Sequence, residues 1–176
     1  SAVAQDLAYE VDGWGSKKYP NALLGVVALM RQTFIDANWY REASEKTNQF
    51  PQLNEPLKIN KDLAIISRWI SNNSPFIFET NHELAVLRSF NIADEFQLNG
   101  WIKGSGYEYR RITEIAGVNP FIILPLNFPV TPDISDPYQA LSYSTSELKH
   151  WDMAPDNPAV LISHNIPIAF TSDGLQ

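Results

Sequence analysis

The chain has 176 residues, of which 44% are apolar and 19% are charged, and it contains no cysteine. This length and apolar share predict a globular domain with a substantial core and exclude an intrinsically disordered chain. Thirteen basic against twenty acidic side chains give a net charge of −7, so we expect no nucleic-acid partner. The lack of cysteine excludes disulfides, Cys-ligated zinc and thiol nucleophiles, but it leaves the compartment, cytoplasmic or exported, undetermined.

No apolar run approaches the roughly 20 residues that cross a bilayer, so we expect a soluble chain without membrane association. The longest run, residues 22–30, stops at Arg31. The sequence starts without an initiator methionine or a basic leader, and it ends directly after an apolar segment. We therefore interpret residues 1–176 as a single fragment of a longer protein.

Helices are predicted in the first 74 residues. Pro20 suits a first helical position and precedes a long apolar run, which predicts a mostly buried helix from there to about Glu45. A second helix is predicted over residues 60–71, where Leu63, Ile66 and Ile70 share one side. We accordingly divide the chain into a helical segment, residues 1–74, and a second segment, residues 75–176.

Short apolar runs alternate with helical stretches in the second segment. Four strands are predicted, at residues 76–78, 99–103, 121–124 and 166–170. The patterns Thr80-x-x-Glu83 and Ser144-x-x-Glu147 have the form of capping boxes that open two of the helices between them. Uniformly apolar strands separated by helices predict a parallel sheet that is buried on both faces.

About four βα units in this length predict an α/β fold, a partial TIM (β/α)8 barrel, since a complete barrel needs about 250 residues. A small doubly wound domain is the alternative. Half a barrel would leave open strand edges, which the missing half or a second copy in a homo-oligomer would have to cover.

Functional groups of parallel α/β folds collect beyond the C-terminal ends of the strands. Asp173 follows the last predicted strand and could bind a metal or act as a general base, or it could be a turn residue before Gly174. Glu79 ends the first apolar strand, as a metal ligand or as a surface glutamate. Lys103 ends the next strand, either as a catalytic lysine or in a salt bridge with Glu79.

The candidate substrate-binding residues also follow strand ends: Thr80, Ser105 and Asn127. Gly104-Ser105-Gly106 could hold an anion with its backbone N–H groups or form a tight turn, and it lacks the third glycine of a dinucleotide fingerprint. The histidines show no metal-binding spacing, so we expect each to be solvated or packed: His82, inside the first turn of a helix, His150 and His164.

Six stretches in order carry a further signal: residues 19–40, 78–96, 103–106 (Lys-Gly-Ser-Gly), 125–129 (Pro-Leu-Asn-Phe-Pro), 148–158 and 170–174 (Phe-Thr-Ser-Asp-Gly). Together they resemble the C-terminal half of the catalytic barrel of metal-dependent amidohydrolases, in particular the imidazolonepropionase-like branch. The resemblance implies a TIM barrel, from helices before the fifth strand to the eighth strand. It also implies hydrolysis of amide or related C–N bonds in a small-molecule substrate, with one or two divalent metals, expected to be zinc.

The resemblance also implies residue roles. Asp173 matches the family's aspartate after the eighth strand, which binds metal and takes the proton of the water. Glu79 stands where the fifth strand supplies a ligand histidine, and Lys103 or a close neighbour where the sixth supplies another. A carboxylate can still ligate a hard cation, whereas a protonated lysine cannot.

The leading hypothesis is therefore a fragment of a metal-dependent amidohydrolase-like hydrolase, inactive alone. The alternative is a non-catalytic barrel relative that binds a ligand or a partner, suggested by the replacement of both histidines. A third reading is a doubly wound domain that binds an anion at Gly104-Ser105-Gly106.

Overall fold

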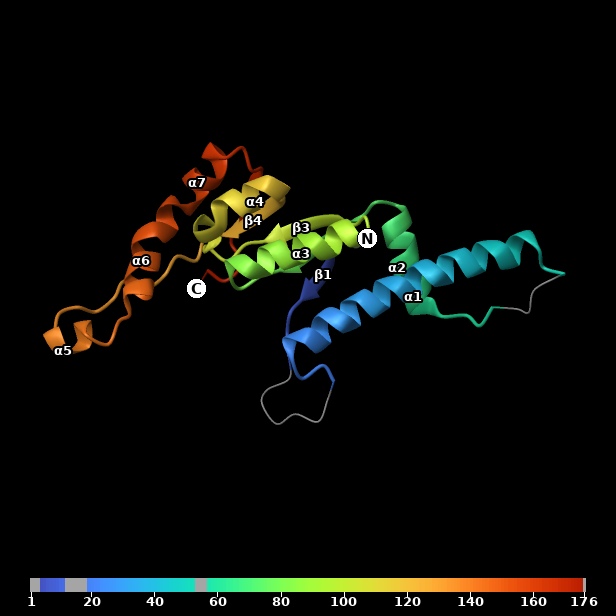
Figure 1. The fold of residues 1–176 in the computed structure, drawn as a ribbon, viewed down its shortest axis with the longest axis horizontal. Coiled ribbons are helices and arrows are strands. Elements are labelled where there is room, and N and C mark those ends of the chain that lie inside the picture. The colour runs from blue at the N-terminus through green and yellow to red at the C-terminus, as the bar shows by residue number, and fades with distance from the viewer. Residues whose placement is uncertain (1–3, 12–18, 53–56, 176) are drawn as a thin grey trace. The chain divides into compact units, whose positions relative to one another are not determined.

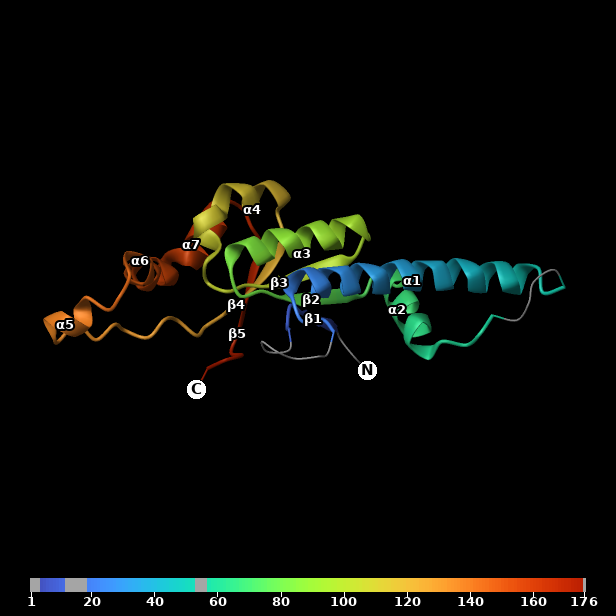
Figure 2. The same ribbon diagram turned by 60° about the horizontal axis from the view of Figure 1, so that its bottom comes forward.

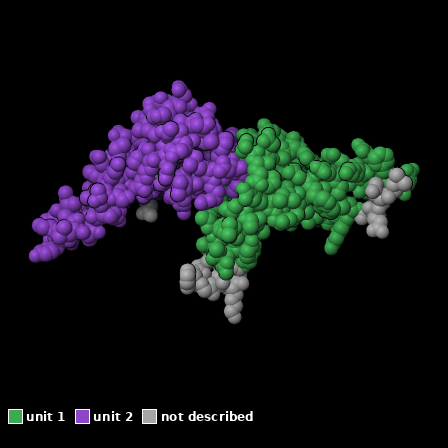
Figure 3. All heavy atoms as spheres, viewed as in Figure 1, with its two compact units in different colours: residues 1–76, 94–99 green, residues 77–93, 100–176 purple. Residues whose placement is uncertain are grey.

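The computed structural model describes residues 4–11, 19–52 and 57–175. Within them the chain divides into two compact units, which Figure 3 distinguishes by colour. Unit 1 comprises residues 1–76 and 94–99, and unit 2 comprises residues 77–93 and 100–176. The strands follow one another as β1-β2-β3-β4-β5 in a parallel sheet flanked by helices, which confirms the α/β fold class of a partial TIM-like barrel (Figure 1).

Unit 1 contains β1 (Gln5–Ala8), the long helix α1 (Leu23–Gln49) and α2 (Lys61–Ser71), which packs on α1 (Figure 2). The side chain of Asn60 caps α2 by accepting hydrogen bonds from two backbone N–H groups of its first turn. Phe34 of α1 is 2% exposed and lies with its ring centroid 5.7 Å from that of Phe76 and 5.3 Å from that of Phe96. These aromatic contacts form the centre of the unit's core.

The sequence prediction for α1 needs two corrections. The helix begins at Leu23, three residues after Pro20, and ends at Gln49. It is buried along one stripe, Val26, Met30, Phe34 and Ala37, instead of on most sides. Leu24 is 81% exposed and Trp39 is 59% exposed. Apolar content alone overestimated the burial, because the helix packs through one face.

The strands that contribute to unit 2 are β2 (Pro75–Glu79), β3 (Asn99–Lys103), β4 (Phe121–Pro125) and β5 (Ile168–Thr171). The parallel pairing places Ile102 opposite Ile122, and Ile122 opposite Ile168. All four predicted strands are present, β3 with the predicted bounds and the others with ends shifted by at most two residues. One further strand, β1, was not predicted, because its sequence Gln-Asp-Leu-Ala lacks an apolar run.

Several helices connect these strands: α3 (Glu83–Glu95), α4 (Ile112–Val118), α5 (Pro137–Ala140), α6 (Thr145–Met153) and α7 (Asn157–Ser163), with 3-10 turns at Glu108–Arg111 and Ala154–Asp156. The long connection from β4 to α6 carries α5 (Figures 1 and 2). In the described part of the chain, no helix combines the length and low polarity that a membrane crossing requires.

One of the two predicted capping boxes is confirmed. The side chains of Ser144 and Glu147 exchange hydrogen bonds with each other's backbone N–H groups at the start of α6. The prediction for Thr80 and Glu83 is wrong, since Thr80 Oγ1 donates to the carbonyl oxygen of Lys103 at 2.8 Å. His82 lies just before α3 and caps it instead, because its Nδ1 accepts the N–H of Ala85 at 3.3 Å.

The packing of unit 2 predicts opposite effects for two Gly→Ala substitutions. A Cβ at Gly100 would lie 2.7 Å from the Cβ of Ala93, which cannot rotate away. Gly100→Ala should therefore lower the free energy of unfolding by about 1–3 kcal/mol, measured by urea denaturation. In α4 a Cβ at Gly117 meets nothing within 4 Å, so Gly117→Ala should leave stability unchanged or raise it by up to about 1 kcal/mol. Equal effects of the two substitutions would contradict this packing.

Candidate functional site

Three charged side chains meet at the C-terminal edge of the sheet. The Nζ of Lys103, at the end of β3, lies 2.8 Å from Oε1 of Glu79, at the end of β2. The same ammonium forms an ion pair with Oδ2 of Asp173, two residues after β5. We call these residues the carboxylate–lysine cluster. The sequence placed all three at strand ends, and the structure brings them into direct contact.

The contacts within the cluster favour the charged forms of Lys103 and Asp173. Hydrogen bonds to Asp173 and then to Glu79 raise the pKa of Lys103, against the opposing effect of burial. The hydrogen bond from Lys103 lowers the pKa of the Asp173 carboxyl. A protonated lysine has no lone pair, so Lys103 in this state can act as a hydrogen-bond donor and a positive charge only.

The residues of this cluster do not fit a divalent metal site. A zinc site takes three or four nitrogen, sulfur or oxygen ligands. The described residues contain no group of three or more His, Cys, Asp or Glu side chains that could hold a metal ion. Two carboxylates converge here, and the ammonium of Lys103 contacts both. The metal roles that the resemblance implies for Glu79 and Asp173 therefore stay predictions.

The turn after β3 is organised by a buried carboxylate that sequence reasoning missed. Glu108 is 0% exposed and accepts hydrogen bonds from the N–H groups of Ser105 at 2.6 Å and Gly106 at 3.0 Å. Asn157 Nδ2 donates to the same carboxylate at 2.7 Å. A Cβ at Gly104 would lie only 2.8 Å from Glu108 Oε1, which explains the glycine. The turn does bind an anion with its backbone, but that anion is the chain's own Glu108.

This arrangement corrects the anion-binding reading of Gly104-Ser105-Gly106, because two of its N–H groups are already used internally. A sequence signal was available. Ser105-x-x-Glu108 has the same Ser-x-x-Glu spacing as the capping box at Ser144, and it also joins a carboxylate to the backbone of a preceding turn.

The three predicted substrate-binding residues lie in different surroundings. Thr80 joins β2 to β3 through its hydrogen bond to the carbonyl of Lys103. Ser105 and Asn127 both line a cavity of about 200 Å³ beyond the ends of β3 and β4, together with His150 and Phe170. The structure thus brings two of the three to a shared cavity.

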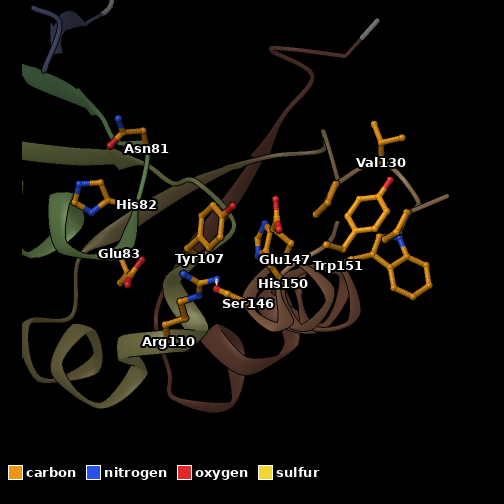
Figure 4. A pocket seen from close by; sticks show the side chains of 13 residues that line it. Asn81, His82, Glu83, Tyr107, Arg110, Val130, Ser146, Glu147, His150 and Trp151 are labelled. Atoms are coloured by element: carbon orange, nitrogen blue, oxygen red, sulfur yellow. Dashed lines mark hydrogen bonds between the residues drawn. The ribbon is translucent and has the colours of Figure 1, made fainter. Parts of the chain in front are cut away.

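A larger cavity of about 490 Å³ adjoins it in unit 2 (Figure 4). Tyr107, Pro129 and His150 line both cavities. The ring of His150 stacks on Tyr107 with 3.6 Å between centroids, and its Nδ1 lies 3.4 Å from the hydroxyl of Tyr109. Burial, and to a smaller extent the charge of Arg110, lowers the pKa of His150 and favours the neutral imidazole.

His150 is therefore packed, as the sequence suggested, but it also forms a wall of both cavities. Its functional surroundings could not be read from the sequence, because Tyr107 lies 43 residues before it and no short motif joins them.

No family model and no curated protein matches this chain. Among solved structures, the chain is similar to the crystal structure of an amidohydrolase from Thermotoga maritima MSB8, with a TM-score of 0.64 and 19% sequence identity. The match covers 90% of this chain and 37% of that protein, so the chain spans well under half of its length. At this identity the similarity shows the fold alone, that of part of an α/β barrel.

The burial of Glu108 predicts a clear stability effect. In Glu108→Gln, the amide NH₂ would face N–H donors that now give hydrogen bonds to a carboxylate oxygen. We expect a loss of about 1–3 kcal/mol or more in the free energy of unfolding, measured by denaturant titration. Glu114→Gln is the matched control, since Glu114 is exposed and pairs with Arg111 on the surface, and it should have little effect. Equal stability of the two variants would contradict the role of Glu108.

The cluster also predicts a change in titration. Lys103→Met should raise the pKa of the Asp173 carboxyl toward the ordinary aspartate value of about 3.9, as measured by carbon-13 NMR. Because the folded-state pKa of Asp173 is lowered, the ion pair stabilises the fold fully only at a pH above that ordinary pKa. This contribution is lost as the pH falls through the lower, folded-state pKa. An unchanged titration of Asp173 in the variant would show that the ion pair is absent in solution.

Proposed function

We propose that this chain is part of an amidohydrolase-like barrel that binds a small molecule at the C-terminal ends of its strands without a catalytic metal in the carboxylate–lysine cluster. One observation supports this proposal: the ammonium of Lys103 contacts the carboxylates of both Glu79 and Asp173. A divalent cation there would have to displace a positive charge that already has two partners. The mutual repulsion of lysine and metal makes simultaneous occupation unfavourable.

The surroundings of the cluster support ligand binding. Ser105 and Asn127 face a cavity at the same strand ends, and a second cavity adjoins it across Tyr107 and His150. Cavities at this edge are the common ligand sites of parallel α/β folds. In this proposal Ser105 and Asn127 contact the ligand, and Thr80 holds the end of β3 in place through its hydrogen bond to Lys103.

The second candidate function is metal-dependent hydrolysis of a C–N bond, with Asp173 and Glu79 as metal ligands and Asp173 and Lys103 as catalytic residues. The convergence of both carboxylates and the amidohydrolase-like fold favour it. Further ligands, zinc ligands in particular, would then have to come from residues that the structure does not describe or from other parts of a longer protein. Under this candidate, too, the chain by itself would be inactive.

Metal content separates the two candidates. The full chain, incubated with zinc and dialysed, should retain far less than one zinc per chain by plasma mass spectrometry. Lys103→Met should bind divalent cations more tightly than the wild type, because two neighbouring carboxylates lose their internal counter-charge. Arg111→Met is the control, since it frees a single surface carboxylate, that of Glu114. One tightly bound zinc per wild-type chain would instead overturn the metal-free proposal and favour the metal-dependent candidate.

A further inference from the structure

Arg110 lines the larger cavity with much of its hydrogen-bonding capacity unused. A guanidinium has five N–H donors. The Nε of Arg110 donates to the Tyr109 hydroxyl at 3.4 Å, and Nη2 donates to Ser146 Oγ at 3.1 Å. Its Cζ also lies 4.5 Å from the ring centroid of Tyr107. These contacts fix the plane of the guanidinium, while no carboxylate of the described residues forms an ion pair with it.

Glu83 supplies an opposite charge to the same cavity. It lies in the first turn of α3, near Arg110 in Figure 4, and no described residue gives a hydrogen bond to its carboxylate. The pKa of Arg110 is raised chiefly by the hydrogen bond with Tyr109, and also by the charge of Glu83. The two charges are thus near enough to interact, yet they are not paired directly.

The other carboxylate of this cavity, Glu147, is committed through one of its two oxygens. Oε2 of Glu147 accepts hydrogen bonds from the backbone N–H and the hydroxyl of Ser144 in the capping box of α6. The neutral form of His150 adds no positive charge. Among the described residues, the cavity therefore combines a guanidinium without an ion pair, that of Arg110, with a carboxylate that accepts no hydrogen bond, that of Glu83.

The remaining wall of the cavity includes apolar and aromatic side chains beside the polar Asn81, His82 and Ser146. Pro129, Val130, Tyr143 and Trp151 line it, and Figure 4 shows Val130 and Trp151 away from Arg110 and Glu83. The volume of about 490 Å³ is within the range of small-molecule sites. A ligand with two opposite charges at one end and an apolar body at the other matches this distribution.

We propose that this cavity binds a free α-amino acid with a large apolar side chain. Arg110 would hold the carboxylate through its unused N–H donors, and Glu83 would accept hydrogen bonds from the ammonium. The apolar side chain would lie against Pro129, Val130 and Trp151. This proposal goes beyond the proposed function, because it concerns the larger cavity and not the one that Ser105 and Asn127 line.

Three probes of similar shape test it by NMR titration of the full chain. Phenylalanine carries both charges, 3-phenylpropionate lacks the ammonium, and phenethylamine lacks the carboxylate. We expect phenylalanine to bind at least ten-fold more tightly than either analogue. Absence of phenylalanine binding, or equal affinity for the three probes, would overturn the proposal without any variant protein.

Two substitutions test which residue binds the carboxylate of the ligand and which binds its ammonium. Arg110→Gln should remove the preference for phenylalanine over phenethylamine, and Glu83→Gln should remove its preference over 3-phenylpropionate. Arg111→Gln and Glu114→Gln are matched controls, because these neighbouring residues pair with each other and do not line the cavity. Wild-type selectivity in Arg110→Gln or Glu83→Gln would refute the assignment.

The result is separable from the test of the proposed function. Zinc content depends on Glu79, Lys103 and Asp173, none of which lines this cavity. A metal-free chain with no selectivity for phenylalanine would overturn the amino-acid proposal alone. A zinc-loaded chain that selects phenylalanine would overturn the metal-free proposal alone.

Discussion

The contact of one ammonium with two carboxylates defines the chemistry of the strand-end site. Lys103 of β3 forms ion pairs with Glu79 of β2 and with Asp173, which follows β5. The contact thus links residues at the ends of three strands. Ion pairs with partly exposed groups contribute little to folding stability. The importance of the contact is chemical: it keeps Asp173 ionised and Lys103 protonated, and it offers an external cation a site that is already neutralised in part.

A second carboxylate, Glu108, shapes the chain next to this cluster. Its bonds to the backbone of Ser105 and Gly106 determine how the chain leaves β3 immediately after Lys103. Asn157 connects the same carboxylate to the start of α7 and also accepts the N–H of Tyr109. A buried carboxylate is costly unless its oxygens are hydrogen-bonded, and here they are. Through this network α7 helps to position Tyr107 and Tyr109. The ring of His150 stacks on both of these tyrosines.

The sequence predicted the features that depend on local patterns. The apolar runs that became β2 to β5 were recognisable because strands of a parallel sheet are rich in apolar residues, although Phe170 of β5 is 55% exposed. The same rule overlooked β1, which contains Gln5 and Asp6. Placing functional groups at strand ends was enough to select Glu79, Lys103 and Asp173, and to anticipate the bond between Glu79 and Lys103.

Features that depend on contacts between distant residues were not predictable in this way. Thr80 matched a capping pattern, but the carbonyl of Lys103, 23 residues away, is the partner of its hydroxyl. The cavity around His150 joins residues of α3, the turn after β3 and α6. Such a grouping follows from the packing of helices in unit 2, which a single sequence does not specify residue by residue.

The two parts of the site differ in how fully their charges are satisfied. In the carboxylate–lysine cluster each charge has a direct partner, so a ligand would have to compete with existing ion pairs. In the larger cavity Arg110 contacts Tyr107 and Ser146 and keeps unused donors, and Glu83 lies near it without pairing. The free-energy cost of binding is lowest where the protein groups are already oriented and still unpaired. The proposed recognition of a ligand is therefore favoured at Arg110 and Glu83 over the carboxylate–lysine cluster.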